Sequence, residues 1–138
     1  IATAQAWDDE MRARIAQHQT QRGTGWTTFD EPDAIEALIA EQAAPGRAVL
    51  VDCLTLWITN LMMAEADIDA RGDALCAALA RTAGPVVCVS NEVGLSIVPE
   101  NRMARDFRDH AGRLHQKVAA MATQVHFIAA GLPLTLKG

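Results

Sequence analysis

Residues 48 to 52 read Ala48-Val49-Leu50-Val51-Asp52, an uninterrupted apolar run that ends in an acid. A second run, residues 86–89, ends in Ser90-Asn91-Glu92, and a third spans residues 125–128. Continuous rather than alternating apolar residues are typical of parallel strands that helices cover on both faces. The three runs therefore predict buried strands of a mainly parallel sheet.

Segments with helical spacing separate these runs. The clearest apolar stripe, at i, i+3, i+4, i+7 and i+8, is formed by Leu54, Trp57, Ile58, Leu61 and Met62. Other helices are predicted to begin at the acids of residues 8–10, at Pro32, near Asp69 and at Pro99. On the helix after Pro99, the residues expected to face inward are Met103, Phe107, Ala111, Leu114, Val118 and Met121. With a last strand over residues 132–136, the order of elements predicts an α/β domain.

Composition narrows the class of protein. The 138 residues fit one domain, and half of them are apolar while 21% are charged, which excludes a disordered chain. The longest aliphatic stretch, residues 48–51, is far shorter than the roughly 18 residues of a membrane span. The net charge of −5 disfavours a nucleic-acid partner. Three cysteines without a CxxC pair, and no signal peptide, favour the cytoplasm.

Polar residues follow two of the predicted strands. In open α/β sheets, ligands bind at the carboxyl ends of the strands, so Asp52 and the segment Ser90-Asn91-Glu92 are candidate site residues. An acid placed like Asp52 can hold Mg²⁺ or its bound water. Asn91 and Glu92 are candidates for a further site at the same edge of the predicted sheet. Acids also end many strands as turn formers or helix caps. The residues alone leave both interpretations open.

His18 is the candidate nucleophile. It is predicted at the end of the first helix, before a loop over residues 19–25, where an imidazole also has a purely structural use. A neutral imidazole that faces a phosphorus atom, assisted by Arg22, would divide a nucleotidyl transfer into two easier steps. Trp26 beside the glycines of this loop is either a wall of the core or a surface on which a base stacks. His110, His115 and His126 lack metal-ligand spacing and are interpreted as structural.

A set of short motifs makes the chain similar to a known family. They are Ile1-Ala2-Thr3-Ala4, Asp8-Asp9-Glu10-Met11, Arg14-Ile15, His18, Arg22, Trp26-Thr27-Thr28, Val51-Asp52-Cys53-Leu54-Thr55, Thr59-Asn60-Leu61, Ser90-Asn91-Glu92-Val93-Gly94, Ile97-Val98-Pro99-Glu100-Asn101-Arg102 and Gly131-Leu132-Pro133. The family that the chain resembles is the bifunctional adenosylcobinamide kinase/adenosylcobinamide-phosphate guanylyltransferase (CobU/CobP) family. The resemblance spans the whole chain and is most specific over residues 90–113.

The resemblance implies a P-loop, RecA-like three-layer fold with a mainly parallel sheet that assembles as a homotrimer. It also implies two reactions in the assembly of adenosylcobalamin. ATP or GTP phosphorylates the aminopropanol hydroxyl of adenosylcobinamide. GTP then guanylylates a histidine of the enzyme, and the GMP passes to adenosylcobinamide phosphate to give adenosylcobinamide-GDP. The implied partners are these nucleotides and corrinoids.

By position, His18 matches the histidine that the family guanylylates. The positions that match the family's nucleotide contacts are Ala2, Thr3, Ala4, Gln19, Thr20, Gln21, Arg22, Asp30 and Asp52. Within this hypothesis Asp52 lies near Mg²⁺ or the ribose, and Arg22 contacts phosphate.

The chain opens at Ile1 without an initiating Met, as if at the end of a strand. The family's N-terminal strand and glycine-rich phosphate loop are therefore expected before Ile1, since GxxxxGK[ST] does not occur in residues 1–138. Two further functions stay open beside the main hypothesis. One is a P-loop small-molecule kinase in which His18 only packs, and the other is a nucleotide-binding subunit without turnover.

Overall fold

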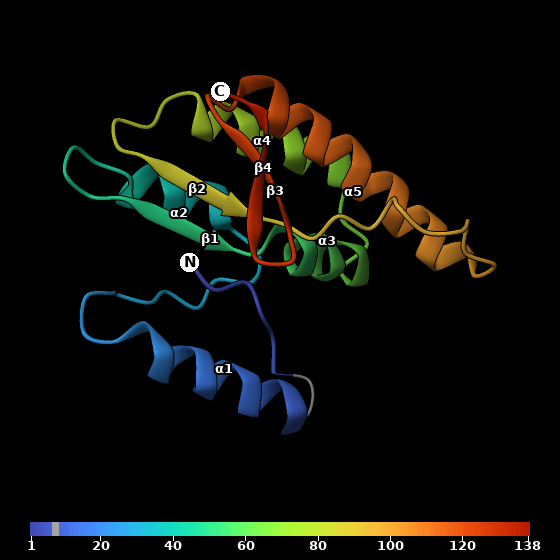
Figure 1. Ribbon diagram of the computed structural model, residues 1–138, viewed down its shortest axis with the longest axis horizontal. Coiled ribbons are helices and arrows are strands. Elements are labelled where there is room, and N and C mark those ends of the chain that lie inside the picture. The colour runs from blue at the N-terminus through green and yellow to red at the C-terminus, as the bar shows by residue number, and fades with distance from the viewer. Residues whose placement is uncertain (7–8) are drawn as a thin grey trace.

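The structure is a computed structural model that describes residues 1–6 and 9–138 (Figure 1). Asp8, expected in the first helical turn, lies outside the described residues, as do the side chains of Arg14, His18, Gln19, Gln21 and Arg22. The elements are α1 (Asp9–Arg22), α2 (Ile35–Gln42), β1 (Val49–Asp52), α3 (Leu54–Met63), α4 (Ile68–Leu79), β2 (Val86–Val89), α5 (Arg102–Met121), β3 (Val125–Ala129) and β4 (Leu132–Lys137). The predicted alternation of strands and helices is confirmed.

A parallel sheet forms the centre of the fold. β1 and β2 pair in parallel, with Val49 opposite Val86 and Asp52 opposite Val89. Ala2 adds a further parallel segment, because it bridges Asp52 on one side and Asp30 on the other. The structure is therefore a mixed α/β fold with a parallel sheet.

The core is formed by β1 together with the helices α2, α3, α4 and α5, and α3 supplies more of its fully buried residues than any other element. Trp57 and Ile58 are completely buried, Leu54 and Leu61 nearly so, and Met62 packs against them from a partly buried position. The predicted stripe of α3 is thus confirmed, because spacing of three and four residues places these side chains on one face. Ile35, Ile39, Val51 and Leu75 complete the centre of the core from α2, β1 and α4. Among the described residues, no helix is long and apolar enough to cross a membrane.

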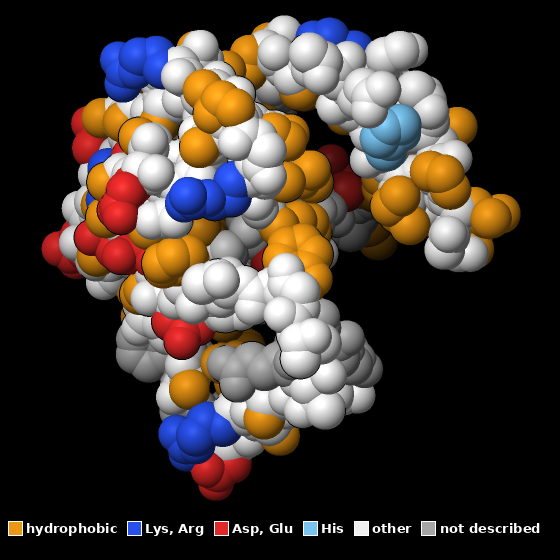
Figure 2. Space-filling view, turned by 90° about the vertical axis from the view of Figure 1, so that its left-hand side faces the viewer, with side chains coloured by type: hydrophobic (Ala, Val, Ile, Leu, Met, Phe, Trp, Pro, Cys, Tyr) orange, Lys and Arg blue, Asp and Glu red, His pale blue; other side chains and the backbone are white. Residues whose placement is uncertain are grey.

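The expected burial of the second and third apolar runs is wrong. β2 alternates between half-buried and exposed residues, and Val87 is 56% exposed. β3 pairs with β4 in an antiparallel hairpin, and Ala130 and Gly131 close its turn with positive φ. This hairpin is a sheet of its own and is not hydrogen-bonded to β1 or β2. The hairpin exposes Ile128, Leu132, Leu134 and Leu136. Figure 2 shows many apolar side chains on the part that projects at the upper right, above a hollow.

Two helices also differ from the sequence expectation. α1 continues to Arg22, so residues 19–22 are helical and the predicted loop begins only at Gly23, which has a φ of +68°. A glycine in this left-handed conformation ends a helix without the steric cost that a Cβ would impose. On α5, Ala111 and Leu114 are buried and Phe107 and Val118 are partly buried. The inward prediction fails at the two ends of α5, because Met103 is 54% and Met121 37% exposed.

Asn60 ties the first segment of the sheet to α3. Its side-chain amide is buried and donates to the Thr3 carbonyl (2.8 Å) and to the Pro32 carbonyl (2.9 Å). Replacing Asn60 by leucine, which is similar in size, is expected to lower the free energy of unfolding by about 2 kcal/mol, since each unpaired buried carbonyl costs about 1–3 kcal/mol. Urea denaturation measures this loss. Thr59→Val is the control, because among the described residues its hydroxyl bonds to the Thr55 carbonyl of the same helix and to no other element. Equal stability of both variants would contradict the role of Asn60.

Candidate active site

Four backbone segments meet at one edge of the parallel sheet. Asp52 ends β1 and its register partner Val89 ends β2, so residues 90–92 begin beside Asp52. On the other side of β1, the bridges of Ala2 bring Asp30 to the same edge. Open α/β sheets bind ligands at the carboxyl ends of their strands. The structure thus brings together Asp30, Ala2, Asp52 and residues 90–92 as one polar rim.

Thr3 holds the backbone that follows Asp52. Its side chain is completely buried, and its hydroxyl donates to the Cys53 carbonyl (2.7 Å) and accepts from the Cys53 N–H (2.8 Å). The Thr3 N–H also donates to the Asp52 carbonyl (3.1 Å), and the Asp52–Cys53 peptide bond is cis. The hydroxyl of Thr3 therefore both donates and accepts a hydrogen bond within the protein. Thr3 positions Asp52, while Ala4 follows it as a half-buried residue.

A chain of hydrogen bonds joins three elements at the carboxyl end of β2. The Asn91 N–H donates to Thr55 Oγ1 on α3 (2.7 Å), and Thr55 Oγ1 lies 3.2 Å from Ser90 Oγ. Ser90 Oγ lies 2.6 Å from Nε2 of His115 on α5. The other ring nitrogen, Nδ1, lies 4.0 Å from Oε2 of Glu92. These contacts fix the backbone of residues 90 and 91 beside β1.

His115 joins this rim through Ser90, a contact that the sequence analysis does not predict. The interpretation of His115 as structural stays a prediction. The available signal is its position one helical turn after Ala111, on the inward face of α5. Burial lowers the pKa of His115, and the nearby Glu92 carboxylate opposes this effect only in part. The neutral ring is therefore favoured at neutral pH.

α1 carries the candidate nucleophile. His18 and Arg22 are four residues apart on this helix, so their backbone positions lie on one face, one turn apart. The side chains of His18, Gln19, Gln21 and Arg22 lie outside the described part of the structure. The exposed Thr20 donates its hydroxyl to the Ala16 carbonyl (2.9 Å). α1 lies apart from the helices that cover the sheet (Figure 1).

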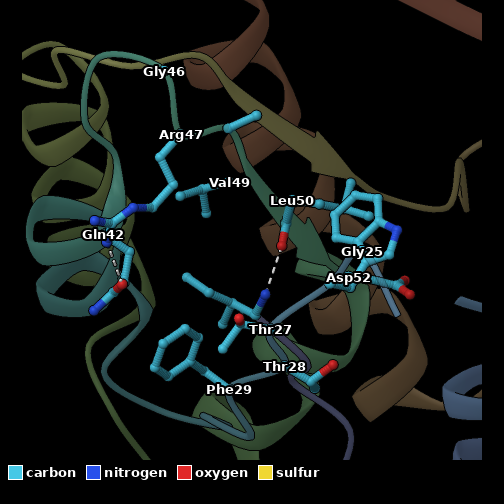
Figure 3. A pocket seen from close by; sticks show the side chains of 13 residues that line it. Gly25, Thr27, Thr28, Phe29, Gln42, Gly46, Arg47, Val49, Leu50 and Asp52 are labelled. Carbon is cyan, nitrogen blue, oxygen red and sulfur yellow. Dashed lines mark hydrogen bonds between the residues drawn. The ribbon is translucent and has the colours of Figure 1, made fainter. Parts of the chain in front are cut away.

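A cavity of about 450 Å³ lies between residues 25–29 and β1 (Figure 3). Trp26 lines it and is 53% exposed, which leaves its ring face available to a stacking partner. Among the described residues that line it, the charged ones are Arg47 and Asp52, and Arg47 donates to the Gln42 side chain (2.9 Å). A triphosphate needs more cationic groups than this lining supplies. The cavity is therefore no polyphosphate site by itself.

The acids of the rim do not form a protein cage for a metal ion. In the described ranges, no group of three or more His, Cys, Asp or Glu side chains is placed to hold an ion. Mg²⁺ usually takes one or two carboxylates and completes its shell with water and substrate phosphates. A single hard oxygen donor such as Asp52 fits that mode of binding.

Comparisons with known proteins agree over nearly the whole chain. A family model described as "Cobinamide kinase / cobinamide phosphate guanyltransferase" matches residues 1–136. The "Bifunctional adenosylcobalamin biosynthesis protein CobP" of Pseudomonas aeruginosa is 46% identical over 140 residues, which cover all of this chain and 81% of the relative. The CobU proteins of the same description from Salmonella typhimurium and Escherichia coli are 41% and 39% identical over 152 residues, covering 99% of this chain and 84% of each relative.

Proposed function

The chain belongs to the cobinamide kinase / cobinamide phosphate guanyltransferase family, and we propose from this premise that His18 carries GMP between the two substrates of the transfer reaction. The protein is an enzyme of adenosylcobalamin biosynthesis with a kinase and a guanylyltransferase activity. The observation that carries the proposal is the match over residues 1–136, which includes all of α1 with His18.

The two reactions use different phosphorus atoms of the nucleotide. In the kinase reaction, the aminopropanol hydroxyl of adenosylcobinamide takes the γ-phosphoryl group of ATP or GTP. In the transfer reaction, a ring nitrogen of His18 attacks the α-phosphorus of GTP, and a P–N bond forms as pyrophosphate leaves. A phosphate oxygen of adenosylcobinamide phosphate then attacks the same phosphorus. The P–N bond breaks, His18 returns to its free state, and adenosylcobinamide-GDP is released.

Residues of α1 are proposed to hold the nucleotide around His18. Arg22 is one helical turn away, and a guanidinium can pair with two phosphate oxygens at once. Gln19, Thr20 and Gln21, which lie between His18 and Arg22 on α1, are proposed as further nucleotide contacts. The continuous helix through Arg22 supports only the placement of Arg22 beside His18, because positions four apart share one face, whereas the contacts of residues 19–21 are proposed from the family resemblance.

The rim of the sheet is proposed as the other half of the nucleotide site. Asp52 would hold Mg²⁺ or the ribose, and Ala2, Ala4 and Asp30 would line the path of the nucleotide on one side of it. Asn91 and Glu92 would line the other side. The buried Thr3 would contribute to this site by holding the backbone beside Asp52. When bound, Mg²⁺ would neutralise negative charge on the phosphates. The pairing of Asp52 with Val89 and with Ala2 supports this placement, since it sets all these residues at one edge.

We also propose the larger arrangement that the family resemblance implies. The fold is a three-layer, RecA-like P-loop domain, preceded by a glycine-rich phosphate loop in the full-length protein, and three copies form a homotrimer. β1 and β2 pair in parallel, and the helices α3 and α4 form the connection between them, which supports this fold. The cytoplasm is the proposed compartment. All three cysteines are free, and burial raises the pKa of Cys88 to about 11, as expected of thiols that stay reduced.

Differently labelled GTP separates the proposed enzyme from the alternatives. The full-length protein is expected to move label from the γ-phosphate to adenosylcobinamide, and label from the α-phosphate to adenosylcobinamide phosphate. Transfer of the γ-label alone would reduce the protein to a simple kinase. Transfer of neither label would leave a subunit that binds nucleotide without turnover. Only transfer of both labels agrees with the proposal.

A further inference from the structure

The chain of hydrogen bonds at the end of β2 begins with one donor whose direction is fixed. The Asn91 N–H can only donate, so Thr55 Oγ1 accepts from it and can give its own hydrogen to Ser90 Oγ. Ser90 can then give its hydrogen to His115 Nε2. This order requires Nε2 to be an acceptor, which places the ring hydrogen on Nδ1, the nitrogen that faces Glu92. Every hydroxyl in the chain then donates once and accepts once.

We propose that His115 is a positioning residue of the nucleotide site, where its neutral ring accepts the Ser90 hydroxyl hydrogen and thereby fixes residues 90–92 beside Asp52. The inference rests on the proposed function, because the rim that His115 holds is the proposed half of that site. His115 contacts Ser90 and lies near Glu92. Asp52 is on the neighbouring strand β1, opposite Val89, the residue directly before Ser90. It acts through Ser90 and not on the substrate.

Protonation of His115 would disturb this chain. A charged ring donates from both nitrogens, so Ser90 Oγ would accept from Nε2 and could no longer give its own hydrogen to the ring. Either Ser90 or Thr55 would then hold a hydroxyl hydrogen without a partner in the chain, because Asn91 already donates to Thr55 Oγ1. Protonation therefore keeps the number of hydrogen bonds but disturbs their order in the segment that carries Asn91.

The charged groups around His115 are few. Glu92 faces the ring from the loop after β2, and α3 carries no titratable side chain. On α5 itself, the positions one turn before and after are Ala111, Gly112, Val118 and Ala119. Arg113 and Lys117 bind Asp69 and Asp73 of α4. Burial thus outweighs the single carboxylate, and the pKa of His115 is lowered from the ordinary value of 6.5.

Two substitutions at position 115 test the proposal through the kinase reaction, which does not depend on His18. His115→Leu removes the acceptor and is expected to lower kcat about 10- to 100-fold, the usual cost of losing a group that orients a site residue, with a smaller change in KM. His115→Gln keeps an acceptor for Ser90 and a donor toward Glu92, and should retain kcat within about threefold of the wild type. The wild-type kcat should fall in acid with an apparent pKa below 6.5. His115→Gln should lack this fall, whereas the control His110→Gln should keep it.

A second measurement covers the case in which a variant folds poorly. Nitrogen NMR of the wild-type protein should show His115 with its hydrogen on Nδ1 and a pKa below 6.5, and Ser90→Ala should lower kcat as His115→Leu does. A hydrogen on Nε2 at neutral pH, or an unchanged kcat in a folded His115→Leu protein, would overturn the proposal. A wild-type protein without either transfer activity would instead refute the proposed function, while the NMR result would still decide the role of His115.

Discussion

Replacing His18 by alanine is expected to lower the rate of GMP transfer by about 10⁴-fold or more, as the loss of a covalent nucleophile does in other enzymes. The kinase rate should stay within about tenfold of the wild type, because phosphoryl transfer to a hydroxyl needs positioning and charge stabilisation but no histidine nucleophile. Initial rates of both reactions with the full-length protein measure the two effects. The expected result is thus a separation of the two activities by one substitution.

Gln17→Ala is the matched control for His18→Ala. Gln17 is exposed on the same helix, directly before His18, and lies outside the proposed contacts. Both activities of this variant should remain close to those of the wild type. If His18→Ala lowered the kinase and transfer rates equally, His18 would serve both reactions or the stability of α1, and the proposed nucleophile would be wrong.

Replacing Asp52 by asparagine is expected to lower both reactions by about 100-fold or more. The substitution keeps the size of the side chain but removes a charge from the rim, and a group that stabilises charge in the transition state is worth about that much. Asparagine keeps the backbone bonds of Asp52 to Ile1 and Thr3, and thermal unfolding of the variant checks that it is folded. Steady-state rates with varied Mg²⁺ measure the loss.

The control for Asp52→Asn is Asp106→Asn. Asp106 pairs with Arg102 on the outer surface of α5, at 3.5 Å, and its loss should change neither reaction. A kinase rate that survives Asp52→Asn while GMP transfer is lost would contradict a rim shared by both reactions. It would confine Asp52 to the chemistry at the α-phosphorus.

Local patterns predicted much of this fold correctly. The stripe from Leu54 to Leu61 is buried in α3, and the run before Asp52 is the strand β1. These features depend on spacing and apolarity within a few residues, which the sequence displays directly. The same is true of the adjacency of Asp52 and residues 90–92, because the ends of parallel strands meet at one edge.

Features that depend on distant contacts were predicted less well. Val87 and the hairpin residue Ile128 are as apolar as Val51, yet they are exposed, and composition alone does not distinguish the two cases. The contact of Ser90 with His115 joins residues 25 positions apart through the packing of α5 beside β2. The extension of α1 to Arg22 is different, because Gly23 is a visible stop signal that the predicted loop boundary did not use.

The covalent role of His18 is tested most directly by locating the modified residue. The full-length protein is incubated with GTP in the absence of corrinoid, quenched without acid, digested, and analysed by mass spectrometry. The account predicts one acid-labile GMP adduct on the peptide that contains His18, which disappears when adenosylcobinamide phosphate is added. A GMP adduct on another residue, or rapid GMP transfer by a protein that never becomes modified, would contradict it.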